Sequence, residues 1–264
     1  MSAHSKMIRV VESELVGKGR ACGRCDEHTR EANLIQSSLV PQQGLCHGSV
    51  EIACRYIPLF DVGGDFADFF VLPNGLIGIY LGDVVGKGLP AAMYSALVMG
   101  VLRGVHKTGT DTANVLARLN DRLIQRPISG RFCSTFYALF DPATAELIFS
   151  NAGMELPLLA GQGDCTQLGE GGLPSGMFPG AAYSRHVVQL APGDCVLFAT
   201  DGLHDLRNHN GLDFSSTQMH EVWAQCAEKS AADAVGFLFE RLMTFSAGTA
   251  ANDDITAIAL KVLP

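Results

Sequence analysis

The feature that most constrains this chain is a predicted β-hairpin that carries an aspartate on each arm. The segments on either side of Pro73-Asn74-Gly75 have the composition of strands, and the tripeptide itself is typical of a tight turn. Asp65 precedes Asn74 by nine residues, and Asp83 follows it by nine. The hairpin is therefore expected to place both carboxylates side by side at its open end.

Two more acidic segments lie at predicted strand ends. Thr200-Asp201-Gly202 follows an apolar run, and Asn252-Asp253-Asp254 directly precedes the last predicted strand, residues 255–262. In an antiparallel sheet the end of one strand lies beside the start of its neighbour, so we expect all four acidic segments to share one sheet edge. Each segment alone is also an ordinary turn signal, and only their common position favours a site.

Carboxylates crowded at one edge resist ionisation, and a bound divalent cation relieves their repulsion. Ligation by oxygen alone favours Mg²⁺ or Mn²⁺ over zinc. The composition agrees with a cation site. The formal net charge is −8 and the basic residues are dispersed, which argues against a nucleic-acid surface. With 264 residues, 47% of them hydrophobic, the chain can build a substantial core.

The sequence predicts a soluble, cytoplasmic protein without a membrane span. Met1 to Leu15 lacks the apolar core of a signal peptide. The most apolar stretch, residues 89–102, is interrupted by Tyr94, Ser95 and Gly100 and falls short of the roughly 18 apolar residues that a span requires.

The eight cysteines do not suggest a disulfide scaffold, and reduced thiols are expected. The spacing of Cys22-Gly23-Arg24-Cys25 suits zinc or redox chemistry, with possible further ligands at His28, Cys46, His47 and Cys54. The alternative is that these cysteines are incidental. It is favoured because no second Cys-x-x-Cys follows.

The remaining pattern predicts layers of helices and antiparallel strands. Pro90 is expected to open a helix that is apolar on nearly all faces and therefore buried, and Asp111 to cap the next helix. Further helices are predicted over 5–20, 26–40, 215–229 and 231–245, and further strands over 52–56, 132–140, 147–151, 156–159, 183–190 and 195–200.

The ordered motifs resemble those of metal-dependent (PPM-type) serine/threonine phosphatases, specifically the bacterial SpoIIE/RsbU branch. They cover roughly Glu31 to Val262. Ile35-Gln36 with Leu39-Pro41 resembles the helix that leads into that domain. The other motifs are Gly63-Gly64-Asp65 with Phe69, Gly82-Asp83-Val84 with Gly86-Lys87-Gly88 and Pro90-Ala91-Ala92, Asn151-Ala152-Gly153, Gly193-Asp194, Thr200-Asp201-Gly202, and Asp253-Asp254-Ile255-Thr256.

The resemblance implies an α+β fold of two packed antiparallel sheets flanked by helices, with two Mn²⁺ or Mg²⁺ ions. Asp83 would bridge the ions, and the carbonyl group of Val84 would help to hold the second. Asp201 and Asp253 would bind the first ion, and Asp65 would bind directly or through water. Asp254 is ranked below Asp253. A water bridging the two cations would attack phosphorus in line, with no phosphoenzyme.

Other residues near these motifs keep two interpretations. Lys87 is a phosphate contact or a solvated loop residue, and His204 touches the site or is a loop histidine. Met154 stands where relatives usually have histidine, which would affect rate, specificity or packing. The segment Gly82 to Gly88 is one residue short of a nucleotide-binding P-loop and has Gly88 at the hydroxyl position, so nucleotide binding is not expected.

For the whole chain, residues 1–40 are predicted to be a helical segment that is regulatory or dimerising, or simply packed on its own domain, and residues 41–264 the phosphatase domain. The resemblance implies a phosphoprotein substrate, namely a STAS-type anti-sigma-factor antagonist. The alternative is a catalytically silent binding module of the same fold. Loss of metal ligands would mark such a module, and the predicted ligands are complete.

Overall fold

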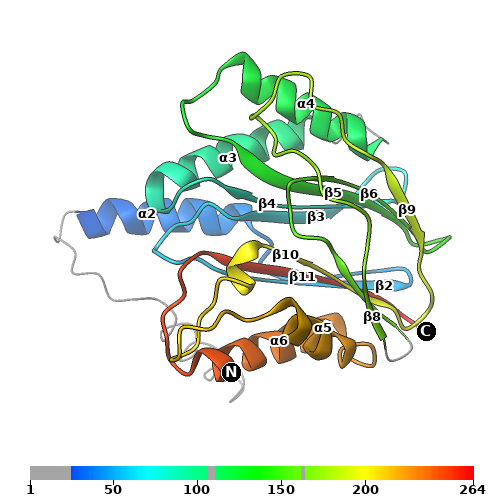
Figure 1. The fold of residues 1–264 in the computed structure, drawn as a ribbon. Coiled ribbons are helices and arrows are strands. Elements are labelled where there is room, and N and C mark those ends of the chain that lie inside the picture. Colours follow the sequence, from blue (N-terminus) through cyan, green and yellow to red (C-terminus); the bar gives the residue numbers. More distant parts are fainter. Residues whose placement is uncertain (1–24, 106–110, 162–163) are drawn as a thin grey trace.

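The structure, a computed structural model, describes residues 25–105, 111–161 and 164–264. Two antiparallel sheets pack face to face, and each carries helices on its outer side (Figure 1). The layers follow the order helices, sheet, sheet, helices. This confirms the predicted α+β sandwich.

The six-stranded sheet has the order β1-β2-β11-β10-β7-β8. Strand β11 lies between β2 and β10, and all eight of its residues are buried. It pairs with β2 along its whole length, from Ile255 opposite Ile57 to Val262 opposite Val50. The strands of this sheet are β1 (Leu45–His47), β2 (Val50–Ile57), β7 (Leu158–Gly161), β8 (Asp164–Gln167), β10 (Cys195–Ala199) and β11 (Ile255–Val262).

The five-stranded sheet has the order β3-β4-β5-β6-β9 and contains the predicted hairpin. Leu72 and Leu76 close its turn through a hydrogen bond of 2.8 Å, and Gly75 adopts φ +85°, which suits glycine. The strands are β3 (Phe66–Val71), β4 (Ile77–Val84), β5 (Cys133–Asp141), β6 (Glu146–Ala152) and β9 (His186–Gln189).

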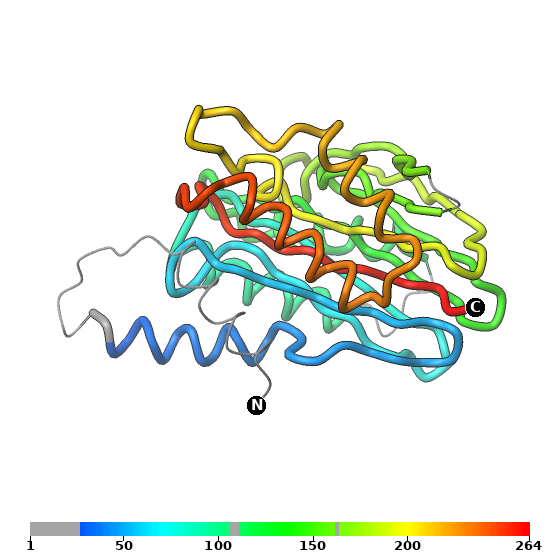
Figure 2. Tube along the Cα trace, turned by 90° about the horizontal axis from the view of Figure 1, so that it is seen from below, coloured from blue at the N-terminus to red at the C-terminus, as the bar shows by residue number. Residues whose placement is uncertain are grey.

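Helices α3 and α4 cover the five-stranded sheet, and α5 and α6 cover the other (Figure 1). Asp111 caps α4 as predicted, because its side chain accepts a hydrogen bond from the N–H of Ala113. Helix α2 lies beside the sandwich and not on a sheet face (Figure 2). The bounds are α2 (Cys25–Leu39), α3 (Gly88–Val105), α4 (Thr112–Gln125), α5 (Ser216–Ala224), α6 (Ala231–Ser246) and the short 3₁₀ helix η2 (Asp201–Leu203).

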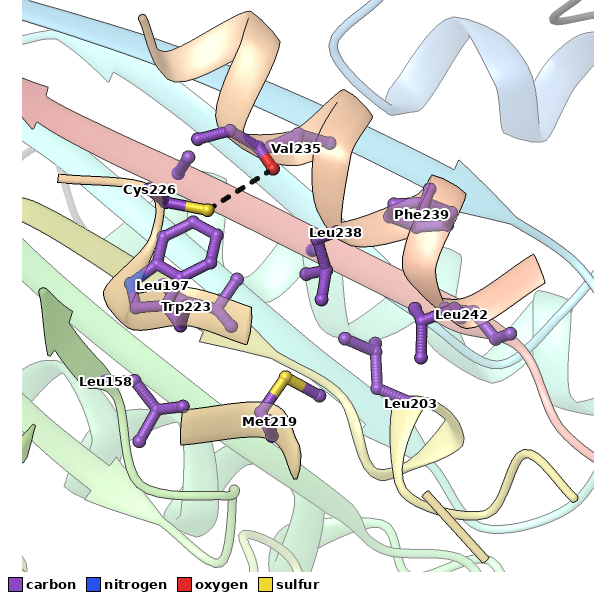
Figure 3. Close-up of a cluster of buried hydrophobic side chains, with 14 of the residues drawn as sticks. Leu158, Leu197, Leu203, Met219, Trp223, Cys226, Val235, Leu238, Phe239 and Leu242 are labelled. Carbon is purple, nitrogen blue, oxygen red and sulfur yellow. Dashed lines mark hydrogen bonds between the residues drawn. The ribbon is translucent and has the colours of Figure 1, made fainter. Parts of the chain in front are cut away.

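Three apolar clusters hold these layers together, one between the sheets and one under each helical layer. Figure 3 shows the cluster between α5, α6 and the six-stranded sheet, where Trp223 is fully buried. The indole N–H of Trp223 donates to the carbonyl oxygen of Cys195 at 3.1 Å, so its polar atom is satisfied within the core.

Helix α3 is not buried on all faces, which corrects the prediction. Its inner face is buried, whereas Leu89, Met93 and Leu97 are exposed at successive turns of its outer face. Among the described residues, α3 is the single helix that is long and apolar enough to cross a membrane. The prediction considered only residues 89–102, which are too short for a span, whereas the helix extends from residue 88 to 105. A core helix of this kind passes the same test, and α3 packs against β3, β4 and α4.

Candidate metal centre

The hairpin brings Asp65 and Asp83 together as predicted. Strands β3 and β4 pair Phe66 with Gly82, so the next position along the ladder sets Asp65 against Asp83. Strands β10 and β11 pair Ala199 with Ala257, which places Asp201 beside the start of β11. Local pattern and strand order therefore position the acidic segments.

The four acidic segments do not share one sheet edge, and this expectation was wrong. Asp65 directly precedes β3 and Asp83 lies near the end of β4 in the five-stranded sheet, while Asp201 and Asp253 lie just outside the ends of β10 and β11 in the six-stranded sheet. The segments still meet, because the two sheets stack face to face and these strand ends lie at the same end of the sandwich. The site is formed between the layers.

Asp65 joins the two sheets directly. Its Oδ2 atom accepts hydrogen bonds from the hydroxyl groups of Thr200, at 2.8 Å, and Thr256, at 2.5 Å. Only 1% of Asp65 is exposed. Burial raises its pKa well above the usual range, and the nearby Asp83 and Asp254 raise it further, although the two threonine hydrogen bonds oppose this shift.

Both carboxylate oxygens of Asp254 are used by backbone N–H groups. Oδ1 accepts from Leu59 and Oδ2 from Gly64, each at 2.6 Å. Asp254 is buried, which raises its pKa, while these hydrogen bonds favour the charged form. Its carboxylate therefore fixes the loop that precedes β3.

Asp253 points to a different partner. Its Oδ2 atom lies 2.8 Å from Nζ of Lys87, and the same ammonium group donates to the carbonyl oxygen of Asn252. A protein cation thus contacts the carboxylate that was predicted to bind a metal ion. The two neighbouring acids differ in their partners. Both oxygens of Asp254 accept N–H groups of a distant loop, whereas Asp253 contacts Lys87 and accepts only the N–H of its neighbour Asp254.

Asp83 and Asp201 face one small cleft, of about 50 Å³, which is also lined by Ser134, Met154 and Glu155. Burial raises the pKa of Asp83 to about 7, and the charges of Asp201, Asp253 and Asp254 contribute. The pKa of Asp201 is also raised, first by burial and then by Asp205, Asp253 and Glu155.

Glycines leave space where the acidic segments meet. A Cβ atom on Gly64 would lie 2.8 Å from the carbonyl oxygen of Val84 and 3.2 Å from Oδ1 of Asp83. A Cβ atom on Gly202 would collide with the carbonyl group of Asp254. Larger residues at these two positions would push the predicted ligands apart.

The donor set fits hard divalent cations. It consists of carboxylates and one backbone carbonyl group, all oxygen, and burial together with mutual repulsion disfavours the charged form of Asp83. Across the described ranges, however, no three Asp, Glu, His or Cys side chains converge as a ready ligand cluster. Three of the five aspartates face protein donors instead, namely Asp65, Asp253 and Asp254.

Some predicted candidates lie away from this arrangement or beyond the description. His204 contacts the carbonyl oxygen of Phe214 through Nδ1 at 3.3 Å, as a loop histidine would. Cys22 lies outside the described residues, as does the side chain of Cys25. Sequence reasoning missed Glu155 and Ser134, although Glu155 directly follows the Asn151-Ala152-Gly153 motif and Met154, and this proximity was an available signal.

A family model described as Stage II sporulation protein E (SpoIIE) matches residues 73–263, well over half of the chain. The chain belongs to the SpoIIE family. The matched segment contains Asp83, Asp201, Asp253 and Asp254, whereas Asp65 precedes it. The resemblance that the motifs indicated is confirmed.

This SpoIIE-family chain is 26% identical over 235 residues to the phosphoserine phosphatase RsbU of Bacillus subtilis, an alignment that covers 87% of the chain and 68% of RsbU. It is 25% identical over 239 residues to Protein IcfG of Synechocystis sp., and this alignment covers 80% of the chain but only 37% of IcfG. The chain therefore spans only part of each relative's length.

Solved structures show the same fold. The SiaA-PP2C domain of Pseudomonas aeruginosa has a TM-score of 0.79 at 20% identity, covering 90% of this SpoIIE-family chain and 96% of that domain. The RsbU and RsbW domains of Rv1364c from Mycobacterium tuberculosis have a TM-score of 0.69 at 26% identity, covering 85% of this chain and 61% of that one. RsbX in complex with magnesium has a TM-score of 0.63 at 15% identity, covering 83% of this chain and 98% of RsbX. The predicted two-sheet fold of PPM-type phosphatases is confirmed.

Proposed function

We propose that this chain is a metal-dependent protein phosphatase that hydrolyses phosphoserine or phosphothreonine with two divalent cations, Mn²⁺ or Mg²⁺. The observation that carries the proposal is the convergence of Asp83 and Asp201 on one cleft from two different sheets. Membership of the SpoIIE family supports it. So does the magnesium named for the RsbX complex, a structural neighbour.

In this proposal the residues that hold the cations have distinct roles. Asp83 would hold both ions, Val84 would contribute its carbonyl oxygen to one, and Asp201 and Asp253 would hold the other. Asp65 would bind directly or through water. Asp254 mainly fixes the adjoining loop, because its two oxygens already accept backbone N–H groups. When bound, such a pair of cations supplies an activated water and neutralises the phosphoryl oxygens.

The protein's own groups then orient the substrate. Gly64 and Gly202 leave the ligands free of side-chain obstruction. Lys87 lies at the start of α3, where a helix N-terminus favours anions, and its ammonium group can leave Asp253 for a phosphate oxygen. Ser134 and Glu155 line the same cleft as Asp83. They would contact the incoming phosphoprotein beside the phosphate.

The substrate we propose is a phosphorylated STAS-type anti-sigma-factor antagonist in the cytoplasm. RsbU is named a phosphoserine phosphatase, and the Rv1364c structure joins an RsbU domain to an RsbW domain, which supports a role in partner-switching signalling.

We also propose that residues 1–40 form a regulatory or dimerising element ahead of the domain at 41–264. In its described part, α2 exposes Leu34 and Ile35 on the side away from the domain. A chain shortened by residues 1–24 is expected to change in activity or in oligomeric state, which light scattering measures. If neither quantity changes, α2 merely packs on its own domain.

The phosphatase assay uses the whole chain with Mn²⁺ and a phosphorylated STAS domain. Phosphate release is expected from the wild type and from Asp213→Asn, which alters an exposed ion pair with Arg207. Asp83→Asn and Asp201→Asn should lose activity while keeping the wild-type circular dichroism. Undiminished release in these two variants would overturn the assignment, and binding of the STAS domain without any release would identify a silent module.

A further inference from the structure

Gln36 forms two hydrogen bonds with the loop before β3, one through each end of its amide group. Its Nε2 atom donates to the carbonyl oxygen of Gly63 at 2.7 Å, and the N–H of Gly63 donates back to Oε1 at 3.0 Å. Only 6% of Gln36 is exposed. The side chain thus pairs with a backbone residue as a neighbouring strand would, and the reciprocal bonds fix which end of the amide is oxygen.

The loop that Gln36 contacts continues directly into the predicted metal ligands. The next N–H, that of Gly64, donates to Oδ2 of Asp254 at 2.6 Å, and Asp65 follows it. A Cβ atom on Gly63 would collide with the carboxylate of Asp254, so the loop backbone packs directly against that side chain. Residues 63–65 are therefore held between α2 on one side and the segment leading into β11 on the other.

Removing the amide of Gln36 would leave buried backbone groups without hydrogen-bond partners. Gly63 belongs to no strand, so Gln36 satisfies both of its backbone polar groups. A buried N–H or C=O group without a hydrogen-bond partner is costly, and a loop avoids that cost by moving its backbone toward water. That movement would carry Gly64 away from Asp254 and shift Asp65 relative to Asp83.

We propose that Gln36 is a positioning residue that fixes Gly63 and Gly64 and thereby raises the affinity of the acidic centre for divalent cations. The inference rests on the proposed function, because it assumes that this centre binds cations. Gln36 itself touches no ligand carboxylate in the described hydrogen bonds and acts through the loop. Partners that orient metal ligands in this indirect way typically change metal affinity about 10–100-fold when they are mutated.

The test compares Gln36→Met, which keeps length and apolar volume but loses the amide, with Gln42→Met as a matched control. Gln42 lies just beyond the C-terminal end of α2 and donates only to the carbonyl oxygens of Ser37 and Val40. For Gln36→Met we expect the Kd for Mn²⁺, measured by electron paramagnetic resonance, to rise at least about tenfold. Gln42→Met should match the wild type.

Two further readouts separate positioning from general damage. In chelated protein, amide hydrogen exchange of residues 59–66 should accelerate in Gln36→Met and not in Gln42→Met, while exchange in β5 stays unchanged. At saturating Mn²⁺ the kcat of Gln36→Met should return to within about threefold of the wild type, since the ligands themselves remain. Gln36→Asn, which is too short to make both bonds, should reproduce the weaker Mn²⁺ binding if the methionine variant folds poorly.

An unchanged Kd for Mn²⁺ in folded Gln36→Met and Gln36→Asn would overturn the inference. The proposed function fails by a different result, namely full phosphatase activity in Asp83→Asn. Loss of activity in Asp83→Asn together with an unchanged Kd in the Gln36 variants would leave the phosphatase and reject only the positioning role.

Discussion

The carboxylate of Asp254 accepts a 2.6 Å hydrogen bond from the N–H of Gly64, a residue 190 positions earlier in the chain. This bond joins the start of β11, in one sheet, to the loop that leads into β3, in the other. It gives Asp254 a structural task that the adjacent Asp253 does not share, because Asp253 faces Lys87. The ranking of Asp253 above Asp254 as a metal ligand stays a prediction, and the geometry gives it a physical reason.

Gly64→Ala should strongly reduce Mn²⁺-dependent activity. The added methyl group would lie 2.8 Å from the carbonyl oxygen of Val84. Neither group can rotate away, because one is attached directly to the backbone and the other is part of it, so the predicted ligands must separate. We expect kcat/KM to fall about a hundredfold.

The matched control for this change is Gly100→Ala in α3, where a Cβ atom meets nothing within 4 Å. It should keep full activity and gain about 0.5–1 kcal/mol of unfolding free energy, because alanine favours the helix. Wild-type activity in Gly64→Ala would contradict the tight approach of these backbones.

The chelated protein should lose stability as pH rises from about 5 to 8. The pKa of Asp83 is raised to about 7 in the folded state, above its value of about 4 in the unfolded chain, so the folded state binds the proton more tightly. That contribution is complete below pH 4 and is lost as pH rises through 7. Asp65, Asp201 and Asp254 shift in the same direction.

Urea unfolding in chelator measures this effect. At pH 8, Asp83→Asn is expected to be more stable than the wild type by about 2 kcal/mol, and its stability should depend less on pH. Saturating Mn²⁺ should reverse the order, because the cation stabilises only a centre that still binds it. An equal pH dependence of the unfolding free energy in both proteins would show that the raised pKa of Asp83 does not cause the loss of stability.

Lys87→Met should weaken substrate binding. If the ammonium group moves from Asp253 to the phosphate, the KM for a phosphopeptide at saturating Mn²⁺ should rise about threefold to fivefold, in line with a half-exposed charge contact, and kcat should change less. The opposite pattern, an unchanged KM with tighter Mn²⁺ binding, would identify Lys87 as a loop residue that only competes with the cation for Asp253.

Arg103→Met should destabilise the junction of α2, α3 and the hairpin. Arg103 donates to Asp68 and Tyr80 within the five-stranded sheet and to the carbonyl oxygen of Leu39 at the end of α2. Its loss leaves the largely buried Asp68 carboxylate without this cation, and the unfolding free energy should fall by about 2 kcal/mol.

The matched control is Arg207→Met, which removes an exposed ion pair with Asp213 of similar length. Its effect should stay within about 0.5 kcal/mol, because water screens the pair. Equal losses of unfolding free energy in Arg103→Met and Arg207→Met would contradict the larger stabilising role assigned to the partly buried pair of Arg103 and Asp68.

The parts of the fold that the sequence predicted correctly depend on local chemistry. Pro73-Asn74-Gly75 set the hairpin register, and Asp111 marked the start of α4, because turn and cap residues act within a few positions. The last strand was predicted with its observed bounds, 255–262, because its residues alternate along a mostly apolar segment, as is typical of a strand.

The parts that could not be predicted depend on tertiary packing. Strands β1 and β8 are short and partly exposed, so neither carries a clear apolar pattern. Nothing local tells whether acidic segments lie on one sheet or between two, and an apolar stripe on α3 reads the same whether it is covered or exposed. The hydrogen-bond partners of Asp254 and Gln36 lie 190 and 27 residues away.

The central position of β11 has a consequence during synthesis. Every other strand of the described chain is translated before it, yet β11 sits between β2 and β10 and brings Asp253 and Asp254 to the site. Until residues 253–262 have left the ribosome, β2 and β10 have no common partner and Gly64 lacks its acceptor. A nascent or truncated chain that ends before β11 would therefore be an inactive polypeptide with two open strand edges, prone to aggregate and open to proteolysis.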